Sequence, residues 1–302
     1  MRIAITGVNG FVGKHLAAEL HDNAHEVVGV GIDPDAAPEI THVLAEYIMV
    51  DLTKQWPALS GLDAIIHLAG LAAVGPSFAK PQQYIEVNSA MLTHMGEYYL
   101  STDGARPRIV AISSGSVYDP RQTMPLSETS AVAYSSPYAV SKLLVEHQCA
   151  YYNSRGLDCV VMRPFNHIGP GQIAGFLVPD LIEKIAARPD TSSPINVGNL
   201  ATKRDYTDVR DVVRAYRLVA TKPSSLDHSL YNVCSGKSLS GDDVLATIAR
   251  AMDCAPVPTE VDESLMRPND CMDIRGDNSR LADEFGWQPT ISFEQTIKDC
   301  VS

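Results

Sequence analysis

The sequence predicts an α/β fold in which a doubly wound parallel sheet is followed by a smaller mixed α/β C-terminal domain. Short β-branched apolar runs alternate with helical segments over the first half of the chain. This alternation is typical of strands buried on both faces and joined by right-handed crossovers. A glycine-rich turn directly follows the first apolar run. After Pro164 the pattern changes, because Gly, Pro and Asn become frequent and irregular segments separate the helices.

The composition is that of an ordinary globular protein. With 302 residues, the chain can form one large domain or two joined ones. No run of 18 apolar residues occurs and the first residues do not form a secretory signal, so we expect a cytoplasmic protein with no membrane partner. The net charge of −12 argues against a nucleic-acid partner. None of the six cysteines forms a CxxC pair, so no metal site is predicted.

The predicted elements follow from the hydrophobic pattern. Strands are expected at Arg2–Thr6, Glu26–Val30, Tyr47–Val50, Ala64–Leu68, Arg108–Ser113 and Asp158–Arg163. Helices are expected at Phe11–His21, Tyr84–Thr102, Pro137–Arg155, Val178–Ala187, Val209–Thr221, Gly241–Met252 and Ser279–Phe285. We expect residues 1–164, with a returning segment near 195–220, to form the first domain. Residues 165–194 and 221–302 would form the second.

A glycine-rich loop lies between the first strand and the first helix. The segment TGVNGFVG contains Gly7, Gly10 and Gly13 in a GxxGxxG pattern. The first glycine permits a tight turn, the second lets the backbone approach a pyrophosphate, and the third lets the helix pack on the sheet. A simple turn is the alternative, but the position after the first strand favours a Rossmann-type dinucleotide site. The residues predicted to bind the cofactor here are Gly7, Asn9, Gly10, Phe11, Val12 and Gly13.

The form of the dinucleotide stays open at the level of sequence. Asp33 lies about 20 residues beyond the loop, where an acidic residue binds the ribose hydroxyls of NAD(H). The predicted second strand ends at Val30, however, so Asp33 could also turn away and leave NADP(H) possible. Asp51 and Leu52 follow the third strand and are expected near the adenine, although a solvated loop aspartate is the alternative.

Hydroxyl and amine side chains follow at the carboxyl edge of the predicted sheet. Ser114 comes directly after the fifth strand, and Tyr138 precedes Lys142 by four residues. Residues four apart share a helix face, so both can point at the edge where ligands bind in open α/β sheets. A nearby ammonium favours the phenolate of a tyrosine. Tyr138 would exchange a proton with a carbinol oxygen during hydride transfer, and Ser114 would hold that oxygen. A packed tyrosine and a solvated lysine are the alternative.

Four motifs in the same order resemble the extended short-chain dehydrogenase/reductase family, and the resemblance covers nearly the whole chain. They are TGVNGFVG, HLAG at 67–70, SSGSVY at 113–118 and YAVSK at 138–142. The resemblance implies that Ser114, Tyr138 and Lys142 are catalytic and that Lys142 also holds the nicotinamide ribose. It places Leu68, Ala69, Gly70 and Arg163 at an NAD(H) or NADP(H) cofactor, although Arg163 could equally be a structural strand-end residue. It also implies a homodimer formed through a four-helix contact of the helices near 84–102 and 137–155.

The second half resembles the branch of this family that acts on GDP-mannose derivatives, and within it the 4-keto reductases. The segments that carry this resemblance are RPFNHIGPGQ at 163–172, VGNLATKRDYTDVRDVVRAY at 197–216, LMRPND at 265–270 and GDNSRLADEFGWQP at 276–289. The resemblance implies a GDP-sugar substrate. Substrate contacts are expected from Ser116, Asn166, Val178, Arg204 and Arg267. The two guanidinium groups suit phosphate oxygens.

Position 116 narrows the expected reaction. In the dehydratase pattern a glutamate stands two residues after the catalytic hydroxyl, whereas this chain has Ser116. A serine hydroxyl cannot act as the additional acid or base that water elimination needs near neutral pH. The expected reaction is therefore NAD(P)H-dependent reduction at C4 of a GDP-4-keto-6-deoxy-hexose to GDP-D-rhamnose or GDP-6-deoxy-D-talose. An NDP-sugar 4-epimerase with tightly bound NAD is the alternative, followed by a non-catalytic NAD(P)-sensing protein.

Overall fold

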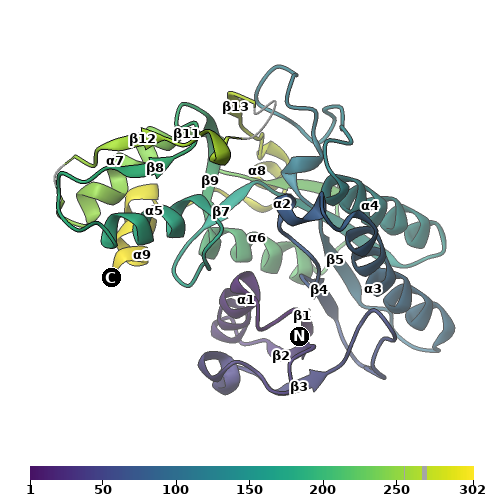
Figure 1. The fold of residues 1–302 in the computed structure, drawn as a ribbon. Helices are drawn as coiled ribbons and strands as arrows, with labels where there is room; N and C mark the ends of the chain where they lie inside the picture. Colours follow the sequence, from purple (N-terminus) through teal and green to yellow (C-terminus); the bar gives the residue numbers. More distant parts are fainter. Residues whose placement is uncertain (255, 267–270) are drawn as a thin grey trace.

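A seven-stranded parallel sheet forms the centre of the molecule (Figure 1). The computed structural model describes residues 1–254, 256–266 and 271–302. The sheet has the order β10-β6-β5-β4-β1-β2-β3. Its strands are β1 Arg2–Thr6, β2 Glu26–Gly31, β3 Glu46–Met49, β4 Ala64–His67, β5 Arg108–Ile112, β6 Asp158–Pro164 and β10 Leu230–Val233. The chain winds outward from β1 in both directions, so the structure confirms the predicted doubly wound sheet and places its switch point between β1 and β4.

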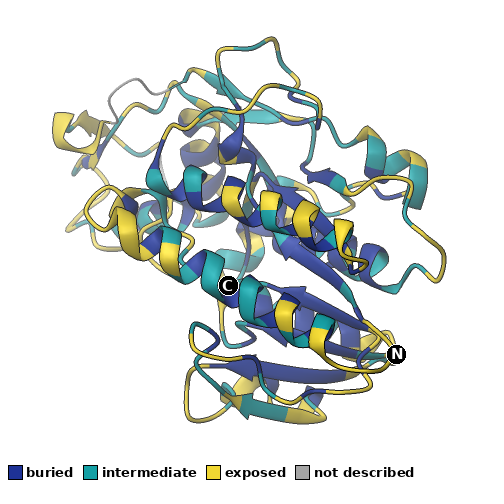
Figure 2. Cartoon of the chain, turned by 90° about the vertical axis from the view of Figure 1, so that its right-hand side faces the viewer, coloured by how far each residue is buried: buried dark blue, intermediate teal, exposed yellow. Residues whose placement is uncertain are grey.

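Helices cover both faces of this sheet, which makes its strands almost completely buried (Figure 2). Helix α1 (Phe11–Asp22) and helix α6 (Val209–Thr221) pack on one face. Helix α3 (Pro81–Ser101) and helix α4 (Pro137–Ser154) pack on the other, side by side. Alternate residues of β1 point into the two cores, with Ile3 in one and Ala4 in the other. The apolar runs in the sequence therefore reflect burial on both faces. The short helix α2 (Val74–Ser77) follows β4.

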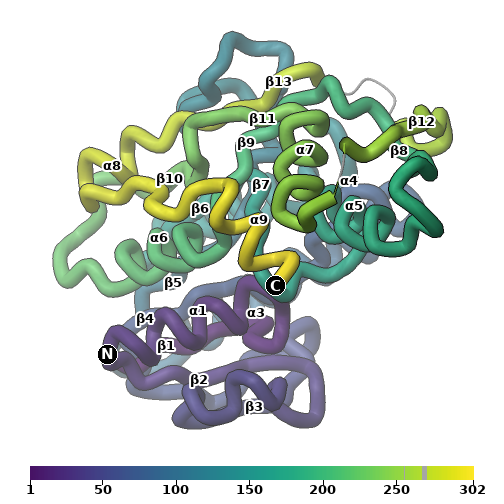
Figure 3. Tube along the Cα trace, turned by 90° about the vertical axis from the view of Figure 1, so that its left-hand side faces the viewer, coloured from purple at the N-terminus to yellow at the C-terminus, as the bar shows by residue number. Residues whose placement is uncertain are grey.

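A smaller mixed region is built from the later part of the chain. Its strands are β7 Asn166–Ile168, β8 Ile195–Val197, β9 Lys203–Asp208, β11 Ser238–Ser240, β12 Thr259–Val261 and β13 Asp273–Ile274. Its helices α5 (Leu177–Ala186), α7 (Gly241–Ala251) and α9 (Phe293–Val301) lie together in Figure 3. They enclose a separate apolar core that includes Val244, Ile248 and Ile297. Helix α8 Ser279–Phe285 and the 3-10 turns Pro38–Val43, Gly115–Val117 and Glu263–Leu265 complete the described elements.

Several strands belong to a different sheet from the one that the expected domain boundaries imply. Strand β10 lies within 221–302, the part assigned to the second domain, but it pairs with β6 in the large sheet. Trp287 is also buried in the core of that sheet, where its Nε1 donates to Asp211 O at 3.0 Å. Conversely, β8 and β9 fall in the returning segment near 195–220 but belong to the small sheets. The positions of β10, α2, α9 and the strands of the smaller region were not predicted. No helix in the described parts of the chain is long and apolar enough to span a membrane.

Candidate active site

The glycine loop lies at the switch point of the sheet and has little room for side chains. Gly7 has a φ of +70°, and a Cβ there would come within 2.9 Å of the Ala69 backbone nitrogen. At Gly13, a Cβ would lie 2.4 Å from Gly7 O. Helix α1 begins after Gly10 with no side chain capping its first turn. Its free N–H groups and the tight loop therefore fit the pyrophosphate of a dinucleotide.

Asn9 joins the glycine loop to the segment after β2. Its Nδ2 donates to Asp33 Oδ2 and to Asp35 O, both at 2.9 Å, and its Oδ1 accepts from Ala37 N at 2.8 Å. Tyr47 Oη also donates to Asp33 O at 2.8 Å. The carboxylate of Asp33 is thus held beside the loop although β2 ends two residues earlier. The structure brings Asp33 to the predicted cofactor site.

The two residues predicted near the adenine, Asp51 and Leu52, contact neighbouring residues of their own loop and core. Asp51 Oδ1 accepts from Thr53 N at 3.0 Å and from Thr53 Oγ1 at 2.6 Å, and Oδ2 lies 3.1 Å from Lys54 Nζ. Leu52 is buried in the core. These contacts match the alternative of a loop aspartate that caps its own turn, and an adenine-binding role for both residues stays a prediction.

The segment after β4 connects the glycine loop with helix α4. Ala69 N donates to Thr6 Oγ1 at 3.1 Å, which fixes the HLAG turn against β1. Gly70 has a φ of +155°, and a Cβ there would lie 2.8 Å from Asn88 Oδ1 and 3.9 Å from Lys142 Nζ. Leu68, Ala69 and Gly70 therefore lie between the glycine loop and Lys142, and their contact with the cofactor stays a prediction.

Helix α4 carries Tyr138 and Lys142 on one buried face. Pro137 occupies its first turn, and the Ser136 side chain caps it by accepting from Ala139 N at 3.1 Å. Lys142 Nζ lies 5.9 Å from the centroid of the Tyr138 ring. It also donates to Ile112 O at 2.8 Å, at the end of β5. The helix thus holds the phenol and the amine at the carboxyl edge of the sheet.

Ser114 completes this group from the loop after β5. Its Oγ accepts from Ser116 N at 3.1 Å and from Ser116 Oγ at 2.9 Å. Its side chain also lies near the phenol of Tyr138 and favours the ionised form of that phenol. Because Ser116 donates to it twice, Ser114 keeps its own proton for Tyr138 or for a substrate oxygen. The structure therefore brings together Ser114, Tyr138 and Lys142, with Ser116 exposed beside them.

Burial controls the protonation of the two helix residues. It raises the pKa of Tyr138 to about 12, and the nearby Ser114 side chain acts in the opposite direction. It lowers the pKa of Lys142 to about 8, which the charge of Glu146 partly counters. The sequence analysis expected the ammonium to lower the pKa of Tyr138. In the folded chain burial instead raises it, so the Tyr138 phenol is neutral near pH 7.

Arg163, predicted to contact the cofactor, instead forms a buried ion pair. Its Nε and Nη2 lie 2.8 and 2.6 Å from the two carboxylate oxygens of Glu146, and its guanidinium lies 4.6 Å from the centroid of the Tyr118 ring. The residue is 4% exposed. These contacts match the structural alternative for Arg163. The sequence analysis missed Glu146, although its spacing of four residues from Lys142 places it on the same helix face.

The residues predicted to contact the substrate are less closely grouped. Asn166 is exposed at the start of β7, directly after the large sheet. Arg204 on β9 donates from Nη1 to Lys203 O at 2.7 Å and to Cys271 O at 2.9 Å. Val178 is 2% exposed and packs in the core of the smaller region, so the structure does not bring its side chain to the site. Arg267 lies outside the described residues.

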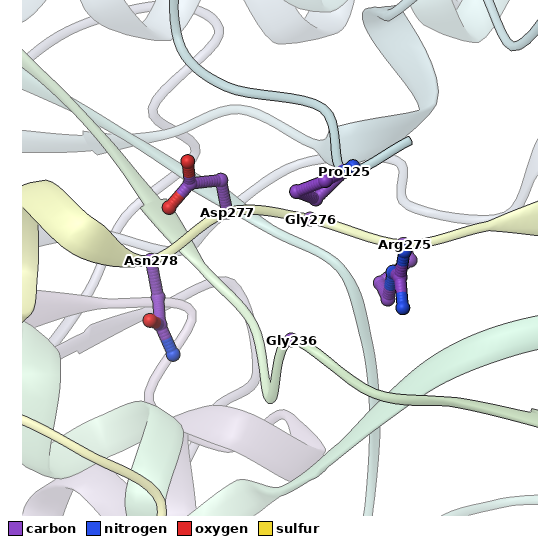
Figure 4. A pocket seen from close by; sticks show the side chains of 6 residues that line it. All are labelled: Pro125, Gly236, Arg275, Gly276, Asp277 and Asn278. Atoms are coloured by element: carbon purple, nitrogen blue, oxygen red, sulfur yellow. The ribbon is translucent and has the colours of Figure 1, made fainter. Parts of the chain in front are cut away.

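A pocket of about 350 Å³ lies elsewhere, between the loop after β10 and the segment after β13 (Figure 4). Its lining residues are Pro125, Gly236, Arg275, Gly276, Asp277 and Asn278. None of them belongs to the predicted site. Over the described residues, no group of three or more His, Cys, Asp or Glu side chains is arranged to hold a metal ion.

Comparison with known proteins places these features in a family. Residues 3–234 match the NAD dependent epimerase/dehydratase family. GDP-6-deoxy-D-mannose reductase from Pseudomonas aeruginosa is 33% identical, over 100% of this chain and 96% of that protein. UDP-glucose 4-epimerase from Mycolicibacterium smegmatis is 30% identical, over 100% of this chain and 97% of that protein. The structure of RMD from Pseudomonas aeruginosa complexed with NADPH aligns with a TM-score of 0.81 and 30% identity, over 99% of this chain and 97% of that chain.

The matches span the glycine loop, the carboxyl edge of the large sheet and helix α4. They confirm the predicted extended short-chain dehydrogenase/reductase resemblance and an NAD(P) cofactor. The chain is an NAD(P)-dependent enzyme that belongs to the NAD dependent epimerase/dehydratase family.

Proposed function

We propose that this enzyme reduces the C4 ketone of GDP-4-dehydro-6-deoxy-D-mannose with NAD(P)H. The product would be GDP-D-rhamnose or its C4 epimer, GDP-6-deoxy-D-talose. The observation that carries the proposal is the convergence of Ser114, Tyr138 and Lys142 beside the glycine loop, with a serine at position 116. The full-length similarity to a GDP-6-deoxy-D-mannose reductase supports the choice of sugar and nucleotide.

The chemistry follows from the protonation states of the site. A reduced nicotinamide, when bound, supplies the hydride that goes to the carbonyl carbon. Tyr138, kept neutral by burial, gives its proton to the oxygen that gains charge. Ser114 donates a hydrogen bond to the same oxygen, and the Lys142 ammonium stabilises the phenolate left behind. This division of roles needs no further acid or base.

Water elimination is disfavoured by the contacts around this group. Ser116 occupies the position of the dehydratase glutamate, and its hydroxyl is engaged with Ser114. Glu146 is an acidic side chain close to Lys142, but Arg163 occupies both of its oxygens. An ion-paired, buried carboxylate of this kind is a poor proton acceptor, because the guanidinium stabilises its charged form.

Substrate recognition is proposed for the side that faces β7 and β9. Asn166, Arg204 and Arg267 would contact the nucleotide diphosphate, and Ser116 would lie near the sugar. Arg204 is held in place by its contact with Cys271 O, which supports a fixed guanidinium at this side of the site.

For the cofactor we propose a preference for NADH over NADPH. Asn9 holds the Asp33 carboxylate beside the glycine loop, where it can accept from ribose hydroxyls and repels a 2′-phosphate. The expected preference in kcat/KM is about tenfold or more, since one pair of close like charges costs on the order of 1–2 kcal/mol at a protein surface. Steady-state kinetics with both cofactors measure it. Asp33→Ser should reduce the preference, and equal use of both cofactors by the unaltered enzyme would contradict it.

The reaction itself is tested by incubating the purified enzyme with GDP-4-dehydro-6-deoxy-D-mannose and either reduced cofactor. We expect stoichiometric oxidation of the cofactor and a 4-hydroxyl product, identified by NMR. A Lys142→Met variant serves as the inactive control. Absence of any 4-hydroxy sugar with both cofactors would contradict the proposal.

An NDP-sugar 4-epimerase is the second candidate, supported by the 30% identity to a UDP-glucose 4-epimerase. Such an enzyme would use the same three residues but purify with tightly held NAD and need no added cofactor. A non-catalytic NAD(P)-sensing protein would bind the cofactor and convert no sugar. The same incubation, with the cofactor content of the purified protein measured first, separates the three.

We also propose a homodimer that pairs α3 and α4 with their copies in a four-helix contact. On α4, Leu144 is 36% exposed and Tyr151 is 51% exposed, and their spacing of seven residues places them on one helix face that a second copy would cover. Light scattering during size-exclusion chromatography should give twice the chain mass, and Tyr151→Glu should shift the enzyme towards monomer. A monomer at micromolar concentration would contradict this proposal.

A further inference from the structure

The buried ion pair of Glu146 and Arg163 lies one helical turn from the amine of the proposed catalytic group. The two side chains are 12% and 5% exposed, respectively, and the guanidinium fork meets both carboxylate oxygens. A buried ion pair is often no more stabilising than apolar residues of similar size, because both charges lose their hydration. Folding stability alone therefore does not explain why this ion pair is buried here.

Three consecutive residues at the end of β5 bind three successive turns of α4. Ile112 O accepts from Lys142 Nζ at 2.8 Å, Ser113 Oγ donates to Glu146 Oε1 at 2.5 Å, and the Ser114 side chain lies near the phenol of Tyr138. Tyr138, Lys142 and Glu146 thus form one stripe along the helix, and each member has its own contact on the strand end. A shift of α4 along β5 would break all three contacts at once.

The charge of Glu146 is held in place from the opposite side. Arg163 comes from the neighbouring strand β6, and the Tyr118 ring covers its guanidinium. Tyr118 Oη in turn donates to Asn232 Oδ1 on β10 at 2.6 Å. The carboxylate is therefore anchored through β6 and β10 and cannot swing towards the substrate.

Among the groups described around Lys142, Glu146 is the anion that favours the protonated form of the Lys142 amine. On α4, Tyr138 is a neutral phenol, and Tyr84 on α3 faces that ring. On β4, His67 is buried and neutral at pH 7, because burial, and secondarily the charge of Lys142, lower its pKa to about 3. Of the ion pair, the Glu146 carboxylate is the member whose charge raises the pKa of Lys142.

We propose that Glu146, oriented by Arg163, is a positioning residue that keeps Lys142 protonated and in register with the end of β5. This inference rests on the role proposed above for Lys142 but not on the identity of the sugar. A catalytic ammonium that is buried and lacks an anion would lose its proton near neutral pH. Glu146 extends the working range of the site to higher pH.

The test is the titration of Lys142 itself, followed by NMR of enzyme labelled with ¹³C at the lysine Cε and assigned with Lys142→Arg. In Glu146→Gln/Arg163→Met the buried charges are removed together, so the fold is not left with an uncompensated arginine. We expect the midpoint of Lys142 to fall by about one pH unit from its value in the unaltered enzyme. In Glu146→Gln alone it should fall further, because the Arg163 charge is then unopposed.

The matched control is Glu284→Gln/Lys222→Met, which removes another largely buried ion pair far from the stripe in sequence. It should leave the Lys142 midpoint unchanged. An unchanged midpoint in both Glu146 variants would overturn the proposal and leave the pair a purely structural role. Because the titration needs no sugar, its result tests the role of Glu146 even if the proposed substrate is wrong. If a substrate is turned over, the pH at which kcat falls on the alkaline side should also decrease in the Glu146 variants, by the same number of pH units as the Lys142 midpoint.

Discussion

Two buried regions of this enzyme differ in the kind of side chain that fills them. Where α4 meets the ends of β4, β5 and β6, the interior holds His67, Lys142 and Arg163. The core between α5, α7 and α9 is instead formed by aliphatic side chains such as Val244 and Ile248. Buried charges cost stability unless they are paired, whereas buried aliphatic groups contribute it. If the first interior serves the proposed reaction and the second serves folding, substitutions in the two should affect different measurements.

Tyr138→Phe should have the largest effect. The change removes the only atom through which this ring donates a proton while keeping its packing. We expect kcat to fall by about 10²–10⁴-fold, the usual contribution of a positioned general acid. Cofactor binding, measured by fluorescence titration, should stay within about twofold of the unaltered enzyme. Turnover close to that of the unaltered enzyme would remove Tyr138 from the chemistry.

Ile248→Ala should have its effect on folding alone. Ile248 is completely buried between α7 and its neighbours, so truncation leaves a cavity that costs about 2–5 kcal/mol of unfolding free energy. Urea unfolding monitored by circular dichroism measures this loss. The same variant should bind NADH with unchanged affinity at low temperature. A matched loss of cofactor affinity would show that the two interiors are coupled.

Lys142→Met should abolish activity and increase the free energy of unfolding. The pKa of Lys142 is lowered to about 8 in the folded chain from 10.5 in the unfolded one. The unfolded state therefore binds more protons between these values, and stability rises as pH increases through that window. Below it the buried ammonium costs about 3 kcal/mol, and the lost bond to Ile112 O offsets about 1 kcal/mol of the gain.

The variant should thus be about 2 kcal/mol more stable than the unaltered enzyme at pH 7 and inactive. The difference should shrink towards pH 10, because the unaltered enzyme has by then lost the buried charge. Urea midpoints at both pH values provide the measurement. A variant that is less stable at pH 7 would show that burial of this lysine is fully compensated.

Ser116→Ala should have the smallest effect. It removes the hydroxyl donor to Ser114 but leaves the backbone bond from Ser116 N. We expect kcat to fall by about three- to tenfold, the value of one neutral hydrogen bond. Ser116→Thr should restore most of the rate. Equal losses in both variants would point to steric disturbance of the loop and not to the missing donor.

The sequence predicted the parts of this structure whose signals are local. The β-branched runs and the glycine loop led to six strands of the large sheet, and the four-residue spacing led to Tyr138 and Lys142. Strand β10 was missed because LYNV is short and contains Asn232, and its place depends on β6, about 70 residues earlier in the chain. Arg163 was expected at the cofactor from the family resemblance, because the sequence does not show that β6 and α4 bring it to Glu146. The pKa of Tyr138 was expected to fall because sequence shows neighbours but not burial.

The central claim is tested most directly by following the hydrogen that reaches the sugar. The enzyme is incubated with GDP-4-dehydro-6-deoxy-D-mannose and NADH or NADPH carrying deuterium at C4 of the nicotinamide, and the product is examined by NMR. The account predicts one deuterium at C4 of a 4-hydroxy sugar for each cofactor oxidised, with the proton at C5 retained. Conversion of the sugar without net oxidation of the cofactor, or exchange at C5 with solvent, would contradict it.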